Sequence, residues 1–552
     1  MKKNKFFKKT FEKRRLGFSL IFSMLVVLSQ LIGYNIIYYD TFLPINIRQL
    51  ILAILIFITV TFFLTFIINT IFILFDKMFK SQSVKKPTYK RLLLFWGIIL
   101  ISWIPYFLQY YPGLIQRDTL DQIAQALNIS LLKDHHPVFY TGIIYVFFHL
   151  GNLINGTNEL GVVLYTICQM LFLSFTYAYS AYFLQKHHVN KFLICFMVLF
   201  YALYPMHAMY SITMYKDVLF AACINWLVIL ILNLVLTPQK ITQKRYLILM
   251  VLIGTAVSLL RQNGFYAILI TMIILIIYYK SYRKNILFAF LSIFLIFIGC
   301  KNIIFPAINA QPTAIKEALA VPLQQLARVD SYKNLTSEES KQINNFFKRD
   351  NIGPLYTPQS ADDVRQNLDQ DYFHNHVKDF INIWTTNALK YPVTYINAFL
   401  ANNVGYYYAF AKERGMLIIT NIEQTPITLL KAHNPNEKIV VISKDLGLET
   451  KSIKEFKIIK RIVNAINDRN LPIFLTIGFN FWLIILCLTY AIYKKNNSYF
   501  LVFLPVLSVW FTILASSVSG VFRFVYCIFT TLPIFIGILG LDKKEEKSGS
   551  FR

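Results

Sequence analysis

The residues best suited to chemistry in this 552-residue chain stand in one polar stretch, 110–137, which reads YYPGLIQRDTLDQIAQALNISLLKDHHP. It holds two carboxylates, an arginine and a histidine pair, namely Asp118, Asp121, Arg117, His135 and His136. A carboxylate can take a proton from an attacking hydroxyl or hold a divalent metal, and guanidinium groups fit phosphate oxygens. The stretch lies between long apolar runs, and charged groups held against a bilayer usually mark a working site.

The elements that position these residues are membrane helices. Hydrophobic residues make up 56% of the chain, and many apolar runs reach the roughly 17–25 residues that a helix needs to cross a bilayer. Backbone groups in hydrocarbon must bond internally, so the spans should be helical, and the runs are too continuous for barrel strands. We predict an all-α polytopic membrane protein with about twelve transmembrane helices. They are expected near 16–37, 49–75, 92–109, 158–184, 192–206, 217–236, 246–260, 265–280, 285–300, 471–492, 498–514 and 524–540.

The short run 137–151 begins with proline and predicts an interfacial or re-entrant helix. Counting it as a full span would move several basic loops to the outside. Without it, the predicted cytoplasmic segments hold 28 Lys or Arg, as the positive-inside rule requires. Those segments are 1–15, 76–91, 185–191, 237–245, 280–284, 493–497 and 541–552. We therefore expect both termini to be cytoplasmic, in a bacterial cytoplasmic membrane, with membrane lipids as neighbours.

The net charge of +27 is explained by these basic loops, so it does not indicate nucleic acid, and no phosphate-cradling glycine loop precedes any helix. The six cysteines fall in or beside apolar runs and are expected in the core. Four regions are predicted. Residues 1–91 form a basic N-terminus with two additional helices, 92–300 a transmembrane core with an outer loop at 110–157, 301–470 an extracytoplasmic soluble domain, and 471–552 the last helices and a cytoplasmic tail.

On this topology, polar residues from distant segments meet at the outer leaflet. Lys216 and Asp217 precede the sixth span, and Arg261 separates the seventh and eighth. Gln325 and Arg328 begin the outer domain, and Arg523 precedes the last span. Carboxylates among several cations fit a lipid-linked phosphate. If a sugar left such a phosphate, the departing group would need cationic stabilisation more than a proton donor. One base and an arginine cluster would suffice, and direct displacement would invert the anomeric carbon.

The chain resembles the GT-C superfamily of glycosyltransferases, and more closely a family of multi-pass bacterial membrane proteins grouped near them. The resemblance covers about 92–540 and depends on YPG, RD, DQ, HHP, YKD, RQNG, PLQQLAR and FRF in that order. It implies a polyprenyl-phosphate-linked sugar donor and an acceptor that is a cell-envelope glycan, lipid or protein. Asp118 matches the acidic position of the first large outer loop and is the expected general base. The adjacent acidic pair of several relatives is absent, since Arg117 and Thr119 flank Asp118, so a divalent metal (Mg or Mn) remains an open alternative.

Simpler roles compete with these assignments. Asp118 could cap a helix N-terminus, and Asp121 could complete the cap or stabilise the helix dipole. The histidines could cap or pair with Asp134, Lys216 could pair with Asp217, and the partner of Arg261 could be a structural carboxylate instead of a donor phosphate.

At the level of the whole protein, the alternatives are a transporter or flippase of a lipid-linked glycan and a non-catalytic assembly partner. A flippase would need charges along a through-path, whereas the charged residues here are predicted on one side.

Overall fold

The structure is a computed structural model, and it describes residues 2–78, 87–411, 426–467, 472–494, 497–516 and 518–541. The cytoplasmic segments expected at 76–91, 493–497 and 541–552 lie wholly or partly outside these residues. In the first half of the chain the structure has the helices α1 (Lys2–Tyr39), α2 (Ile47–Met78), α3 (Tyr89–Gln109), α4 (Arg117–Ala126), α5 (Val138–Asn155), α6 (Asn158–Lys186), α7 (Lys191–Leu203), α8 (Pro205–Ser211), α9 (Lys216–Leu236), α10 (Lys244–Leu260) and α11 (Gln262–Tyr278).

The second half begins with α12 (Arg283–Gly299), a π-helical turn at Cys300–Ile304 and α13 (Phe305–Ala307). The region between α13 and α21 holds α14 (Ala320–Tyr332), α15 (Ser337–Asn344), α16 (Asp362–Gln366), α17 (Gln370–Asn375), α18 (Val377–Lys390), α19 (Pro392–Tyr407) and α20 (Lys457–Asn467). The last three helices are α21 (Ile477–Tyr493), α22 (Phe500–Ile513) and α23 (Tyr526–Ile538). Two small sheets complete the described chain. They are the parallel pair β1 (Leu114–Ile115) and β2 (Thr213–Met214), and the antiparallel pair β3 (Ile427–Leu430) and β4 (Lys438–Val441).

A helix occupies each of the twelve segments predicted to span the membrane. By length and composition, seven described helices are candidate spans, and the bent pair α7–α8 would make an eighth. The helices α11, α21, α22 and α23 are apolar but shorter. The chain is therefore a multi-pass helical membrane protein, while the full count of twelve crossings stays a prediction.

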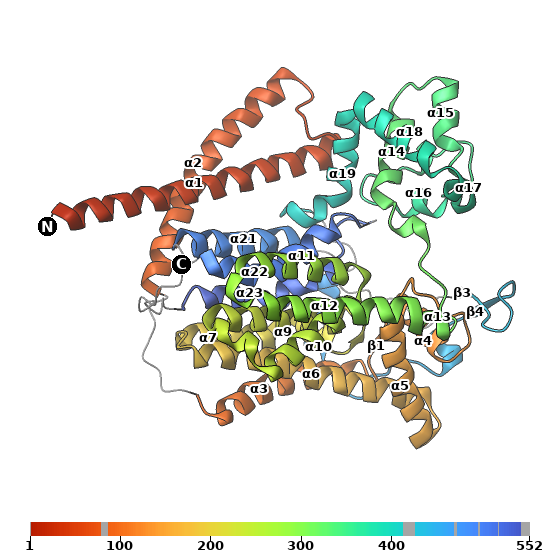
Figure 1. Cartoon of the computed structure of the whole chain (residues 1–552), viewed down its shortest axis with the longest axis horizontal. Helices are drawn as coiled ribbons and strands as arrows, with labels where there is room; N and C mark the ends of the chain where they lie inside the picture. Colours follow the sequence, from red (N-terminus) through yellow and green to blue (C-terminus); the bar gives the residue numbers. More distant parts are fainter. Residues whose placement is uncertain are drawn as a thin grey trace.

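The helix α5 fits the length of a span but lies differently from its neighbours. Figure 1 shows α6, α9 and α12 running along the bundle, with α5 crossing near the end that carries α4 and β1. The start of α1 lies at the opposite end. Two glycines allow α5 to pack against α6, because a Cβ on Gly151 would lie 2.3 Å from the backbone nitrogen of Gly161. Gly156, at φ +65°, then ends α5 and permits the reversal into α6.

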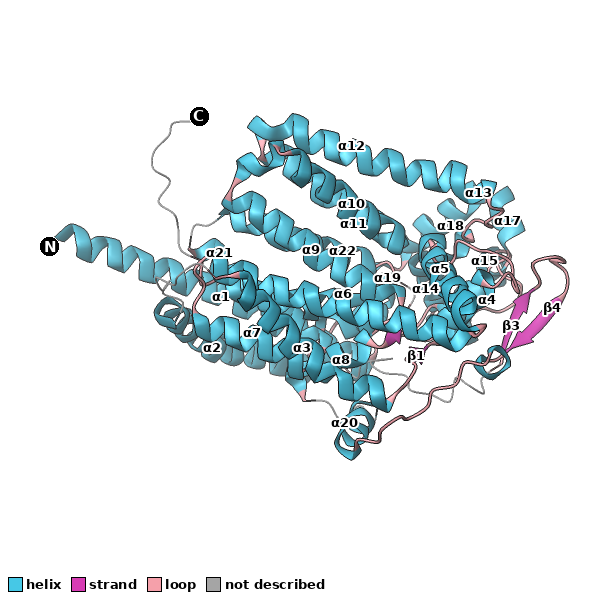
Figure 2. Ribbon diagram, turned by 90° about the horizontal axis from the view of Figure 1, so that it is seen from below, coloured by secondary structure: helices cyan, strands magenta, loops and turns pink. Residues whose placement is uncertain are grey.

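The region between α12 and α21 is divided in the structure. Helices α14 to α18 enclose a separate hydrophobic core that includes Leu323, Phe346 and Phe373. The helix α19 packs against α14 of this group and also against α1 and α21, and the three buried residues of α20 belong to the core of the bundle. Figure 2 shows the β3–β4 hairpin at the same end of the molecule as α4. The described residues contain no sheet-based soluble domain. The region 301–470, predicted to be an outer soluble domain, instead consists of a small helical subdomain and segments that fold back on the bundle, and its side of the membrane stays a prediction.

Candidate functional site

The site is built on two chain segments that begin in the same way. Leu114 and Ile115 pair in parallel with Thr213 and Met214, so the two strands end side by side. After each strand comes one extended residue, then a basic residue and an aspartate in the first helical turn: Gln116-Arg117-Asp118 opens α4 and Tyr215-Lys216-Asp217 opens α9. Two helix N-termini with acidic first turns thus lie together. Their free N–H groups and dipoles favour negative charge there.

Buried hydrogen bonds fix this arrangement. The hydroxyl of Thr119 on α4 donates to the backbone carbonyl of Met214 on β2. From α6, the amide of Gln169 donates to the carbonyls of Ser211 (2.9 Å) and Thr213 (2.8 Å). The amide of Gln122 donates to the hydroxyl of Thr141 at 3.1 Å, which ties α4 to α5. These donors replace the strand partners that a two-residue sheet lacks, so the site is held on the bundle instead of on a loose loop.

Two arginine–aspartate pairs dominate the site. Arg523, just before α23, donates to Asp118 at 2.7 Å, and Arg261, between α10 and α11, donates to Asp217. The pairs differ in burial. The side chains of Asp118 and Arg523 are 29% and 19% exposed, whereas those of Asp217 and Arg261 are 0% and 11% exposed. Phe524 joins the pairs, because both guanidinium groups lie over its ring, at 4.7 Å (Arg261) and 5.2 Å (Arg523).

A third set of charges lies beside them. The ammonium group of Lys216 lies 3.0 Å from Nδ1 of His136, and Nε2 of the same ring lies 3.4 Å from a carboxylate oxygen of Asp121. The neighbouring His135 has a separate partner, Glu317, at 3.8 Å. Glu317 also accepts from Arg365 of the helical region α14–α18. The histidine loop therefore connects the bundle end to that region.

Charge controls the protonation of the acids. Burial alone would raise the pKa of Asp118, but the cations Arg523 and Lys216 hold that pKa well below its ordinary value. Burial would also raise the pKa of Asp121. The hydrogen bond from His136 outweighs this effect of burial, so the pKa of Asp121 is lowered. Partial burial, reinforced by the charge of Lys216, lowers the pKa of His135 to about 4. At neutral pH the resting site therefore has ionised carboxylates that are already neutralised by protein cations.

The structure brings most of the predicted site residues together. Asp118, Asp121, His136, Lys216, Asp217, Arg261 and Arg523 form one charged cluster at one end of the bundle, with His135 at its edge. Arg117 is exposed and makes no ion pair among the described residues. Gln325 and Arg328 contact other regions. Gln325 accepts from the indole of Trp384 at 2.9 Å, and Arg328 donates to Asp40, between α1 and α2, at 2.9 Å.

Several simpler roles considered for these residues are wrong. The N-cap of α4 is Gln116, and Asp118 lies inside the first turn with Arg523 as its partner. Lys216 and Asp217 do not pair with each other, because consecutive residues of a helix point about 100° apart. Asp134 pairs with Lys301 and not with a histidine. The structural carboxylate considered for Arg261 exists, and it is Asp217.

Sequence reasoning missed the aromatic residues and one lysine. Arg523 lies over the ring of Tyr215 at 4.8 Å, and Arg261 over that of Phe220 at 5.6 Å, in addition to their shared contact with Phe524. Tyr215 and Phe524 are direct neighbours of the predicted Lys216 and Arg523, so the YKD and FRF motifs contained the signal. Lys301 gave no such signal, because it lies in the π-helical turn, 167 residues from its partner.

A metal centre has no obvious place here. Among the residues that the structure describes, no group of three or more His, Cys, Asp or Glu is arranged to hold a metal ion. Each carboxylate of the cluster instead faces a protein cation or His136.

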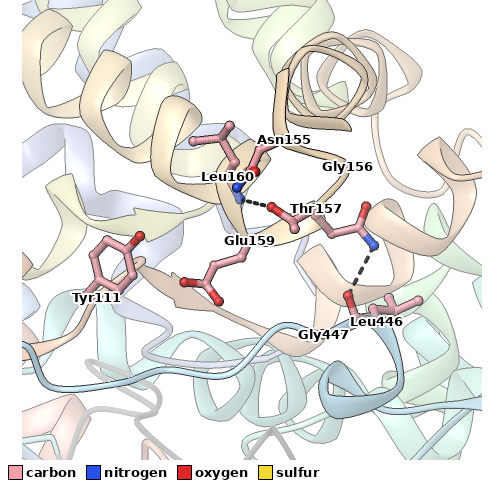
Figure 3. Close-up of a pocket in the computed structure, with 9 residues that line it drawn as sticks. Tyr111, Asn155, Gly156, Thr157, Glu159, Leu160, Leu446 and Gly447 are labelled. Carbon is pink, nitrogen blue, oxygen red and sulfur yellow. Dashed lines mark hydrogen bonds between the residues drawn. The ribbon is translucent and has the colours of Figure 1, made fainter. Parts of the chain in front are cut away.

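A pocket of about 440 Å³ lies at the α5–α6 turn. Its lining includes Tyr111, Asn155 and Glu159, with Leu446 and Gly447 of the segment before α20 opposite them (Figure 3). Asn158 also lines it. The amide of Asn158 donates to the carbonyl of Leu446 at 3.1 Å, which fixes that wall. None of the cluster residues lines this pocket, but Tyr111 begins the segment that leads through β1 to Asp118.

Comparison with known proteins gives a family and no function. No curated protein and no solved structure matches the chain. The sequence does match the profile of a family of unknown function over residues 126–550, a range that includes His136, Lys216 and Arg261 and begins after Asp118. With more than three quarters of its length matched, this multi-pass membrane protein belongs to the DUF6020 family.

Proposed function

We propose that the protein is a membrane glycosyltransferase of the GT-C type. It transfers a sugar from a polyprenyl-phosphate donor to a cell-envelope acceptor on the outer face of the bacterial cytoplasmic membrane. The observation that supports this most is the Asp118–Arg523 pair, partly exposed and next to Lys216, where two helices begin. A base candidate, two cations and two dipoles that favour an anion are thus within one site.

The ion pairs suggest how the donor is received. A phosphate must displace a carboxylate from an arginine, and the exposed pair exchanges more easily than the buried Asp217–Arg261 pair. When phosphate oxygens take Arg523 and Lys216, Asp118 loses the cations that lower its pKa and becomes a stronger base. Donor binding therefore activates the base, and a site without donor stays inert.

The chemical step then needs little more. The acceptor hydroxyl attacks the anomeric carbon, and Asp118 takes its proton. The bond from that carbon to the phosphate oxygen breaks, and the phosphate leaves with the electron pair, stabilised by Arg523 and Lys216. Attack opposite to the leaving group inverts the anomeric configuration. Arg261 acts by holding Asp217 and Phe524 in place, since its guanidinium is nearly buried.

We place the acceptor in the pocket of Figure 3. An aromatic ring beside amide and carboxylate groups is a lining that suits a hydroxyl-rich molecule, and Tyr111, Asn158 and Glu159 provide it. Asp118 lies seven positions after Tyr111, so an extended chain sets an upper limit of about 25 Å between their Cα atoms. A glycan of a few residues, or the end of a polymer, would span that distance.

The test is the variant Asp118→Asn, with Asp379→Asn on the exposed face of α18 as matched control. Membranes containing equal amounts of each protein would be assayed for transfer of labelled sugar from polyprenyl phosphate. Loss of a base should reduce the rate about 10²- to 10⁴-fold in Asp118→Asn and leave the control unchanged. Unchanged transfer in Asp118→Asn would refute the assignment. Transfer that stops only because donor no longer reaches the outer leaflet would support a flippase instead.

A further inference from the structure

We propose that His136 is a proton-linked ligand, which takes up a proton when a phosphate-class oxyanion binds beside Lys216. The inference rests on the proposed function, because the anion in question is the phosphate of the donor. It goes further because it makes the protonation of one histidine depend on whether the anion is bound. The same contacts also assign different roles to His135 and His136, which the sequence does not separate.

The hydrogen bonds of the resting site define the tautomer of His136. An ammonium group has donors only, so Nδ1, 3.0 Å from Nζ of Lys216, must accept with its lone pair. The ring hydrogen then lies on Nε2, which faces the carboxylate of Asp121 at 3.4 Å. The side chain of His136 is only 9% exposed, so the ring has both nitrogens committed and water has little access to either.

An arriving anion makes this tautomer unfavourable. Oxygens bound to Lys216 take over its N–H donors, and the lone pair of Nδ1 then faces a negatively charged oxygen. A proton on Nδ1 turns that repulsion into a charge-assisted hydrogen bond to the anion. Asp121 already holds the other nitrogen and stabilises the imidazolium. Anion binding and proton binding therefore strengthen each other, and the coupling must be reciprocal.

The charges around His136 explain why the anion is required. Asp118 and Asp121 on α4 favour a positively charged ring. Lys216 on α9 opposes it at 3.0 Å, and the ring of His135, whose centroid is 4.6 Å away, adds no charge while it stays neutral. Arg523 is engaged by Asp118. Covering Lys216 with an anion removes the main opposing charge and leaves two carboxylates in favour. His136 then adds a third cation to the leaving phosphate.

Isothermal titration calorimetry on the full-length protein in detergent tests this directly. Two probes are titrated at pH 7.5 in two buffers of different ionisation enthalpy: farnesyl phosphate, and inorganic sulfate, which does not itself titrate near this pH. The slope of observed enthalpy against buffer enthalpy gives the protons taken up on binding. We expect an uptake approaching one proton for sulfate on the wild-type protein, and less than half of it in His136→Gln. The variant should also bind farnesyl phosphate about tenfold or more weakly, as the loss of one charge-assisted hydrogen bond implies.

The matched variant His135→Gln should keep the wild-type proton uptake, and Asp121→Asn should reduce it without removing the histidine. Sulfate binding without proton uptake by the wild-type protein would overturn the inference while leaving the phosphate site intact. So would an uptake that is unchanged in both His136→Gln and Asp121→Asn. If neither probe binds the wild-type protein, and Arg523→Gln gives the same blank titration, the proposed function fails together with the inference.

Discussion

Mutation of the two arginine–aspartate pairs of the cluster should affect different properties: the buried pair mainly the stability, and the partly exposed pair mainly the catalysis. Removing one partner of a buried pair leaves an uncompensated charge in a dry environment, at a cost of about 3–5 kcal/mol. Asp217 meets this condition, because its side chain is fully buried and one of its carboxylate oxygens has no hydrogen-bond partner among the described residues. We therefore expect Arg261→Gln to lower the free energy of unfolding by about 3–5 kcal/mol.

The pair Asp118–Arg523 is accessible to water, so the carboxylate left by Arg523→Gln is resolvated. Its stability cost should be about 1 kcal/mol or less, which is the range of partly exposed pairs. Per folded molecule, Arg523→Gln should reduce the rate of sugar transfer more than Arg261→Gln does, because Arg523 is proposed to contact the phosphate directly. The double variant Asp217→Leu with Arg261→Met should recover most of the stability, since neither charge is then buried alone.

The assay is equilibrium unfolding by SDS titration from maltoside micelles, followed by tryptophan fluorescence. A surface control is Lys390→Gln, whose pair with Glu339 is 48% and 36% exposed and should change stability by less than about 0.5 kcal/mol. Equal losses for Arg261→Gln and Arg523→Gln would show that burial does not distinguish the pairs. The proposal that a phosphate displaces Asp118 from Arg523 more easily than Asp217 from Arg261 would then lose its support.

Three further results are expected. The pKa of His135 falls from about 6.5 to about 4 on folding, so between these pH values the unfolded chain binds more protons than the folded chain. The protein should therefore lose stability as the pH falls from 6.5 to 4. The variant His135→Gln should show a smaller drop in thermal midpoint between pH 7.5 and 5. Arg328→Met should lower the unfolding free energy by about 1–3 kcal/mol, because this nearly buried arginine binds the carboxylate of Asp40. The KM for the donor should be unchanged, since Arg328 does not contact the cluster. A higher KM at full stability would contradict this assignment. In a cysteine-free chain, new cysteines at Lys133, before α5, and at Asn152, in the last turn of α5, should both react with an impermeant thiol reagent from outside, and one at Lys240 only after permeabilisation. Labelling of the first two from opposite sides would make α5 a span.

Much of the fold could be predicted because it depends on local composition. Apolar runs long enough to cross a bilayer became helices in every predicted segment, since a backbone in hydrocarbon has few alternatives. The gathering of Asp118, Lys216, Asp217, Arg261 and Arg523 followed from sorting loops by charge. That step used only the side of the membrane and required no knowledge of which helices are neighbours.

The choice of partners could not be predicted in this way. Arg328 binds Asp40 across 288 residues, and no local pattern indicates that the α1–α2 loop passes beside α14. The parallel strand pair was hidden for a related reason, since two residues are too short to show alternation and become a sheet only when α6 supports them. Helix packing decides such contacts, so sequence reasoning located the site but not its internal connections.

Those internal connections determine how the site must work. Three aspartates face two arginines, one lysine and a histidine, so the resting cluster is close to electrically neutral without any ligand. A neutral cluster does not attract a phosphate by net charge, and the ligand gains only by exchanging places with a carboxylate. Because Asp118 is the most exposed carboxylate of the three, it is the one that leaves, and the group that leaves is also the group positioned to act as a base. Selection of the donor and activation of the base would then be one event, which an always-positive site could not achieve.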